Sequence, residues 1–173
     1  YNTGAFNSGS GAGAIVSFAG STAQTLGGTL GDFTGTNGFN HFEINNTAGL
    51  TIGNNTTIEI KGNLLLTNGI ITTTSTNMLS VVNTSTSAVI PTGGTSTSYV
   101  NGPMTKQFLN GNSFLYPIGK LAVGKGHDCT ITSTAAASSA WTVEYFNPNP
   151  TGIAANLNNP LVVENMLEYW SVN

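Results

Sequence analysis

Two short clusters contain residue types that could bind a metal or act as a nucleophile. His41 and Glu43 lie two positions apart in a strand-like run, so their side chains would share a face, but no third ligand is evident nearby. His127, Asp128 and Cys129 are the residue types of a nucleophilic triad, yet consecutive strand residues point to opposite faces and cannot form the base–nucleophile contact. We therefore expect an exposed polar face at His41 and Glu43, and a buried, apolar role for Cys129.

Carboxylates and cations are too sparse for the common chemistry of extracellular enzymes. A glycoside hydrolase needs two carboxyl groups roughly 5 to 10 Å apart, and no two carboxylates here recur at the 21-residue spacing at which the chain repeats. A polysaccharide lyase would need clustered acidic and basic groups, whereas this chain has four dispersed Lys and no Arg. Calcium loops of repeat proteins are Asp-rich, and the turns here use Asn, Ser and Thr. The sequence predicts no enzyme, no cofactor and no metal site.

Aromatic residues near the C-terminus have two interpretations. Trp141, Tyr145, Tyr169 and Trp170 could form a platform on which sugar rings stack, provided that at least two of them are exposed on one face. The alternative is that they form the core of a small β-sandwich. Both interpretations predict strands in this part of the chain.

The Thr-rich segment 72–76, together with Thr84, Thr86, Thr95 and Thr97, raises a different hypothesis. Regular Thr ladders on a flat face can order water, which would indicate ice binding. However, the columns mix Thr with Asn, Gly and Ser, and Thr is also an uncharged residue that favours strands on a solvated face.

The composition excludes several classes of protein. The 173 residues include 26 Thr, 22 Asn, 22 Gly and 15 Ser, and only 6% are charged, against about 25% in an average domain. A net charge of −3 without Arg cannot provide the phosphate-neutralising surface of a nucleic-acid-binding protein. No apolar run approaches the roughly 18 residues of a membrane span, and the single Cys excludes an internal disulfide.

Short β-prone runs bounded by turn residues occur along the chain and recur every 21 residues, with one earlier spacing of 22. This period predicts an all-β fold, a right-handed parallel β-solenoid of four or five coils, because one coil cannot bury its apolar face alone whereas stacked coils share a core. Stacking would also place like charges over one another, which favours uncharged polar residues outside. The recurring sets are Ile58, Leu79 and Val100; Ile60 and Val81; Leu50 and Ile71; Phe42 and Leu64; Asn54, Ser75 and Ser96.

The pattern changes near residue 105. Pro103, Pro117 and the Gly- and Lys-rich segment 119–126 interrupt the coils, and the aromatic run 141–146 alternates like a strand of an antiparallel sheet. We therefore predict a β-solenoid over residues 1–115. Residues 116–173 would form the start of an antiparallel β-sandwich or cap that continues beyond them. A cap is expected because a terminal coil exposes an open strand edge.

Several short sequence segments, taken in their order along the chain, resemble segments of one protein family: Val16–Gly20, Gln24–Gly28, Phe42–Asn46, Gly62–Ile71, Ser98–Met104, Tyr116–Lys120 and Glu168–Trp170. Together they resemble the long, repetitive cell-surface, adhesin-like proteins of the Bacteroidetes that are secreted by the type IX system. The resemblance implies display on or release from the bacterial cell surface, a role in adhesion, gliding or extracellular fibres, and no catalytic residues.

These observations predict a structural and adhesive segment, a spacer or shaft, of a large extracellular bacterial surface protein. The alternatives are a module that binds glycans or surfaces and a subunit of an extracellular filament. The expected partners are neighbouring domains of the same long chain, surface glycans or other copies of the chain, without nucleic acid and without membrane insertion.

Overall fold

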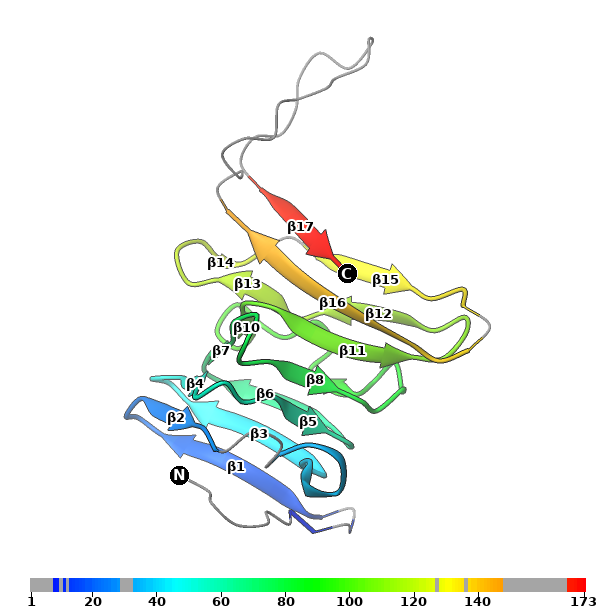
Figure 1. Cartoon of the computed structure of the whole chain (residues 1–173). Helices are drawn as coiled ribbons and strands as arrows, with labels where there is room; N and C mark the ends of the chain where they lie inside the picture. The colour runs from blue at the N-terminus through cyan, green and yellow to red at the C-terminus, as the bar shows by residue number, and fades with distance from the viewer. Residues whose placement is uncertain are drawn as a thin grey trace.

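The chain folds into stacked β-coils. The computed structural model describes residues 8–9, 11, 13–28, 33–126, 128–135, 137–147 and 168–173. About four coils stack along one axis, and each coil contributes strands to parallel sheets that run the length of the stack (Figure 1). Among the described residues, the helical content is one 3-10 turn, η1 (Gly35–Asn37). The predicted all-β class and parallel β-solenoid are confirmed.

Each complete coil has three strands. The first coil contains β1 (Ile15–Gly20) and β2 (Gln24–Leu26). The second contains β3 (His41–Asn46), β4 (Leu50–Ile52) and β5 (Ile58–Ile60). The third contains β6 (Leu64–Asn68), β7 (Ile71–Thr72) and β8 (Leu79–Val81). The fourth contains β9 (Val89–Ile90), β10 (Val100–Asn101) and β11 (Met104–Phe108).

The remaining strands lie at the C-terminal end of the stack. They are β12 (Ser113–Tyr116), β13 (Ile118–Lys120), β14 (Gly124–Lys125), β15 (Cys129–Thr132), β16 (Ser139–Phe146) and β17 (Tyr169–Val172). The first sheet has the order β1-β3-β6-β9, the second β14-β13-β10-β7-β4-β2, and the third β17-β16-β11-β8-β5, while β12 and β15 pair separately.

The core is a set of apolar columns inside the stack. Strand residues alternate between the two faces of a sheet, so Phe42 and Ile44 of β3 are buried while His41 and Glu43 are only half-buried. Burying each large apolar side chain contributes about 1.5–3 kcal/mol, and the repeated columns add these contributions along the whole stack. The columns include Val16, Phe42, Leu64 and Val89; Leu50, Ile71, Val100 and Ile118; and Ile58, Leu79, Met104 and Val143.

The constant 21-residue period is correct for two coils and wrong beyond them. Ile58 pairs with Leu79 as predicted, but Leu79 then pairs with Met104, and Val100 pairs with Ile71. The spacing grows because the connections on either side of β9 are longer than those in the coil before.

The recurring turn residues do not all lie at one corner: Asn54 and Ser75 lie in equivalent turns, before β5 and β8, but Ser96 does not. The turns Thr74–Asn77 and Thr95–Ser98 have the same bridge and the same Thr–Thr hydroxyl contact. The first turn connects β7 to β8, whereas the second connects β9 to β10. The 21-residue recurrence of Ser75 and Ser96 is therefore a repeated local turn at two different corners of the solenoid.

Asn46 fixes one corner from the inside. Its side chain is fully buried, and its Nδ2 donates to the carbonyl oxygen of Thr22 (2.8 Å) and to Oε1 of Gln24 (2.9 Å) in the preceding coil. Its Oδ1 accepts from the backbone N–H of Ala48 at 2.9 Å. Buried polar groups that lose such partners pay their full desolvation cost.

We expect Asn46→Ala to lower the free energy of unfolding by about 2–3 kcal/mol, because three hydrogen bonds are lost and the fully buried amide leaves a cavity behind. Urea-induced unfolding measures this change. Asn45→Ala, in the neighbouring exposed position, is the control and should change stability by less than about 0.5 kcal/mol. Equal losses in both variants would show that the buried network does not stabilise the corner.

Strand direction reverses at the C-terminal end. β13 still pairs in parallel with β10, but β16 pairs antiparallel with β11, and β17 antiparallel with β16. β12 pairs antiparallel with β15. The antiparallel strands expected after the solenoid are thus present, whereas a β-sandwich and the division at residue 115 stay predictions.

Candidate functional site

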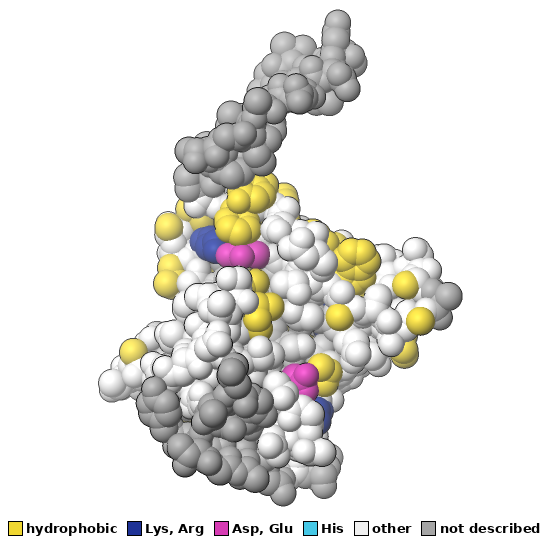
Figure 2. Space-filling model, in the orientation of Figure 1, with side chains coloured by type: hydrophobic (Ala, Val, Ile, Leu, Met, Phe, Trp, Pro, Cys, Tyr) yellow, Lys and Arg dark blue, Asp and Glu magenta, His cyan; other side chains and the backbone are white. Residues whose placement is uncertain are grey.

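The outer face of the β16–β17 ribbon combines hydroxyl, carboxylate and aromatic side chains. Thr142, Glu144 and Phe146 alternate along β16 on this face, opposite Tyr169 and Ser171 of the next strand. Figure 2 shows why this region stands out: most of the visible surface is uncharged and polar, and charged side chains occur only as isolated spots.

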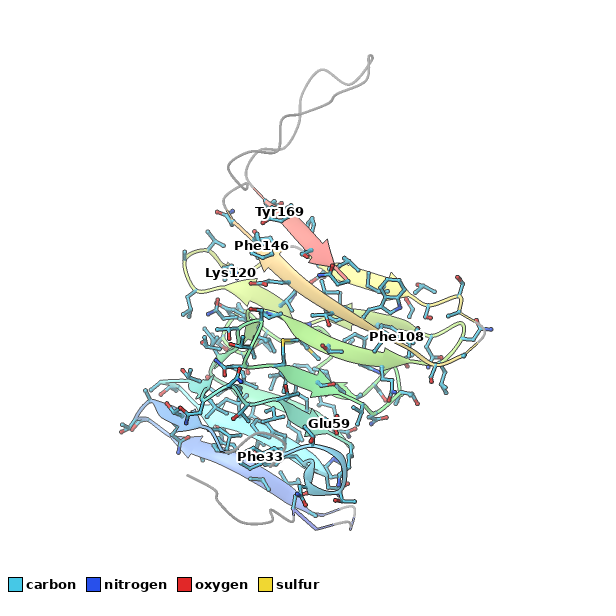
Figure 3. The ribbon with its side chains drawn as sticks, viewed as in Figure 1. Phe33, Glu59, Phe108, Lys120, Phe146 and Tyr169 are labelled. Carbon is cyan, nitrogen blue, oxygen red and sulfur yellow. The ribbon has the colours of Figure 1, made fainter. Side chains whose placement is uncertain are left out.

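One such spot combines an ion pair with stacked rings. Lys120 Nζ lies 2.6 Å from Oε1 of Glu144 and 4.8 Å from the centroid of the Phe146 ring. The Phe146 and Tyr169 rings stack with centroids 4.7 Å apart and an interplanar angle of 5°. Lys120, Phe146 and Tyr169 gather at one end of the ribbon (Figure 3). The half-exposed ion pair contributes at most about 1 kcal/mol to stability, so its main effect is to neutralise and position Glu144.

A groove lies beside this cluster, where the ribbon meets the solenoid. Its volume is about 240 Å³. We call it the ribbon groove, and it is lined by Ser75, Met78, Pro103, Thr142, Glu144, Ser171 and Asn173. The solenoid thus supplies two apolar side chains and the hydroxyl group of Ser75, and the ribbon supplies hydroxyl, carboxylate and amide groups.

The four predicted aromatic residues do not share one face. Tyr145 is 3% exposed, and its hydroxyl lies 2.6 Å from Oε2 of Glu168. Trp141 and Trp170 are half-buried on the same inner face and pack against the core. Tyr169 lies on the opposite, outer face, against Phe146. Of the four, Tyr169 is therefore the residue that borders the outer site.

The two clusters first considered for chemistry have structural partners. His41 Nδ1 accepts from the backbone N–H of Asn63 at 2.9 Å. Glu43 accepts from Thr67 Oγ1 at 2.7 Å, and hydrogen bonds from Ser17 and Thr67 lower the pKa of its carboxyl group. Both residues lie on β3 of the first sheet, on the face opposite the buried Phe42 and Ile44.

His127 of the consecutive His–Asp–Cys segment lies outside the described residues. Asp128 forms an ion pair with Lys125. Cys129 is half-buried against the core, and burial raises the pKa of its thiol, so less thiolate forms at neutral pH. Within the described ranges, no three His, Cys, Asp or Glu side chains come close enough together to hold a metal ion.

One Thr column does stack on the outer face of the second sheet. Thr25, Thr51 and Thr72 lie in register, and Asn101 follows them. Most residues of the predicted Thr ladder lie elsewhere: Thr74, Thr76, Thr95 and Thr97 are in turns, and Thr73 is buried. Ice binding stays a prediction.

Lys106 was not identified from the sequence as a special residue. It is 1% exposed, and its Nζ donates to the backbone carbonyl oxygens of Asn83 (2.6 Å) and Gln107. The ammonium also lies 5.2 Å from the ring centroid of Phe108 and 5.1 Å from that of Phe114. The alternation of Met104, Lys106 and Phe108 along β11 was the available signal, because it places all three on the inner face.

No protein-family model, curated protein or solved structure matches this chain. In the described part of the chain, no helix has the length and apolar character needed to cross a membrane.

Proposed function

We propose that this chain is a structural and adhesive segment, a spacer or shaft, of a larger extracellular protein on a bacterial surface. The observation that supports the proposal is the stack of parallel coils around one continuous core with an almost uncharged outer surface. Stacked coils resist bending because each coil is hydrogen-bonded to its neighbours through several sheets. Because the exterior is polar and almost uncharged, the electrostatic interactions of such a segment depend little on ionic strength.

Secretion and location belong to the same proposal. The resemblance to repetitive surface proteins of the Bacteroidetes supports export by the type IX system and display on the cell surface. In such a protein, this segment would hold neighbouring domains of the same chain at a fixed separation.

Sedimentation velocity tests the shaft. We expect one monomeric species from micromolar to millimolar concentration, with the same sedimentation coefficient at low salt and in molar salt, because few charges exist to screen. Species that grow with concentration, or fibres visible by electron microscopy, would contradict the shaft and support the filament-subunit alternative.

A further inference from the structure

The ribbon groove has the amphipathic lining that a sugar ring requires. Sugars present a carbon–hydrogen face and a rim of hydroxyl groups, and small-ligand sites combine an apolar surface with a few placed polar groups. Met78 and Pro103 provide the apolar surface, while Thr142, Ser171 and Asn173 provide hydroxyl and amide groups. The lining therefore matches both parts of a saccharide.

The charges of the groove point to a neutral ligand. Among the described residues that line the groove, Glu144 is the only charged one, and Lys120 neutralises this carboxylate through Oε1. This described lining contains no cation that would attract a phosphate, sulfate or carboxylate group. Glu144 retains its other carboxylate oxygen as an acceptor, and a carboxylate is a strong acceptor for hydroxyl donors.

The polar groups around the groove are already oriented. Thr142 Oγ1 lies 2.7 Å from Thr105 Oγ1, and Asn173 Nδ2 donates to Ser171 Oγ at 3.2 Å. Both backbone hydrogen bonds between Thr142 and Asn173 hold the end of the ribbon in place. Such fixed groups reduce the entropy lost when a ligand binds.

The groove itself has room for one sugar ring. Its volume of about 240 Å³ lies below the range of roughly 300–1,000 Å³ that is usual for drug-sized ligands. Phe146 and Tyr169 lie further along the same face, where a second ring of an oligosaccharide would lie against Tyr169.

We propose that the ribbon groove binds one ring of a neutral saccharide. The carbon–hydrogen face of the sugar packs on Met78 and Pro103, and its hydroxyl groups bind Glu144, Ser171 and Asn173. The inference rests on the adhesive half of the proposed function, for which it names the ligand class. The proposed glycan site therefore lies on the outer face of the ribbon, and not at the inner aromatic residues Trp141, Tyr145 and Trp170.

The two equivalent turns provide a matched pair of variants. Ser75 lines the groove, whereas Ser96 occupies the same position in the Thr95–Ser98 turn and does not line it. Both serines are exposed. Ser75→Tyr should fill the groove, and Ser96→Tyr should make the same chemical change without touching it.

Saturation-transfer NMR with methyl β-glucoside, methyl β-galactoside and methyl α-mannoside is the test. We expect transfer to at least one of these neutral sugars from the wild type and from Ser96→Tyr, and a loss of about fivefold or more in Ser75→Tyr. Chemical-shift mapping on the wild type should place the largest shifts at Thr142 and Ser171. This mapping tests the site even if Ser75→Tyr fails to fold.

Three results would overturn the inference: no transfer to any of the three sugars, equal loss in both Tyr variants, or stronger transfer to the anionic sugar N-acetylneuraminic acid. The shaft is judged separately, because sedimentation of the monomer does not depend on sugar binding. The shaft proposal therefore holds even if no sugar binds the groove. Conversely, sugar binding can still be measured if the chain assembles into filaments.

Discussion

Gly69→Ala is expected to disrupt the stacking of the second and third coils and to lower the free energy of unfolding by roughly 3 kcal/mol or more. Gly69 has φ +98°, and a Cβ at this position would collide with the backbone carbonyl oxygen of Asn46 in the coil before. The collision involves backbone atoms on both sides, so no side-chain rotation relieves it. Urea-induced unfolding followed by circular dichroism measures the loss.

Gly111→Ala separates the collision from backbone strain. Gly111 also has a positive φ, +79°, but a Cβ there would meet nothing within 4 Å. We expect this control to lose only about 1–2 kcal/mol, the cost of a left-handed conformation for a residue with a side chain. Equal losses in the two variants would show that close approach of the coils at Gly69 is not what requires glycine.

The second large effect concerns pH and Lys106. Burial lowers the pKa of the Lys106 ammonium from 10.5 to about 8. Below pH 8 the folded protein carries the cost of a buried charge. Between pH 8 and 10.5 the folded protein releases this proton while the unfolded chain keeps it, so the contribution of Lys106 to the free energy of unfolding rises with pH.

Other buried groups act in the opposite direction at high pH. Burial raises the pKa values of Cys129 and Tyr116, so the unfolded chain ionises first and stability falls above about pH 9 to 10. The contribution of Lys106 is therefore isolated by comparing the wild type with Lys106→Met, which retains these groups.

We expect the stability of the wild type relative to Lys106→Met to increase by about 2 kcal/mol between about pH 7 and about pH 9.5. Denaturant unfolding at each pH gives the two free energies. Lys61→Met, which removes an exposed lysine, controls for the change in net charge. A difference between wild type and Lys106→Met that stays constant with pH would contradict the buried, pH-dependent charge.

The stacking of the second and third coils could be predicted from the sequence because their equivalent positions lie 21 or 22 residues apart. Phe42 with Leu64, Ile58 with Leu79 and Leu50 with Ile71 all pair as the spacing indicates. The prediction of Val100 over Leu79 was wrong because a repeated turn looks the same in sequence whichever two sheets it connects. A recurring spacing in the sequence shows only that a local turn is repeated. The register in which strands of successive coils pair depends on the length of every connection in the coil.

The candidate site could not be predicted because its residues meet through a reversal of strand direction. Ser75 and Pro103 belong to the parallel coils, whereas Thr142 and Ser171 belong to strands that return antiparallel. A parallel period contains no information about where a returning strand pairs. The aromatic pattern of β16 did predict a strand, and alternation alone divides Tyr145 from Phe146, but it does not tell which face is inner.

Parallel stacking also determines how the chain must reach its fold. Phe42 pairs with Leu64, Leu64 with Val89, and Ile71 with Val100, so each coil has to close a loop of more than twenty residues before its strands gain a partner. The chain loses this loop-closure entropy before the stabilising contacts between coils form. Folding is therefore slower than in helical proteins of the same length. The short β13–β14 hairpin pairs Lys120 with Gly124, and so the most local pairing of the described sheets lies at the C-terminal end of the stack. Folding that starts from such local contacts would proceed from this end towards the first coil.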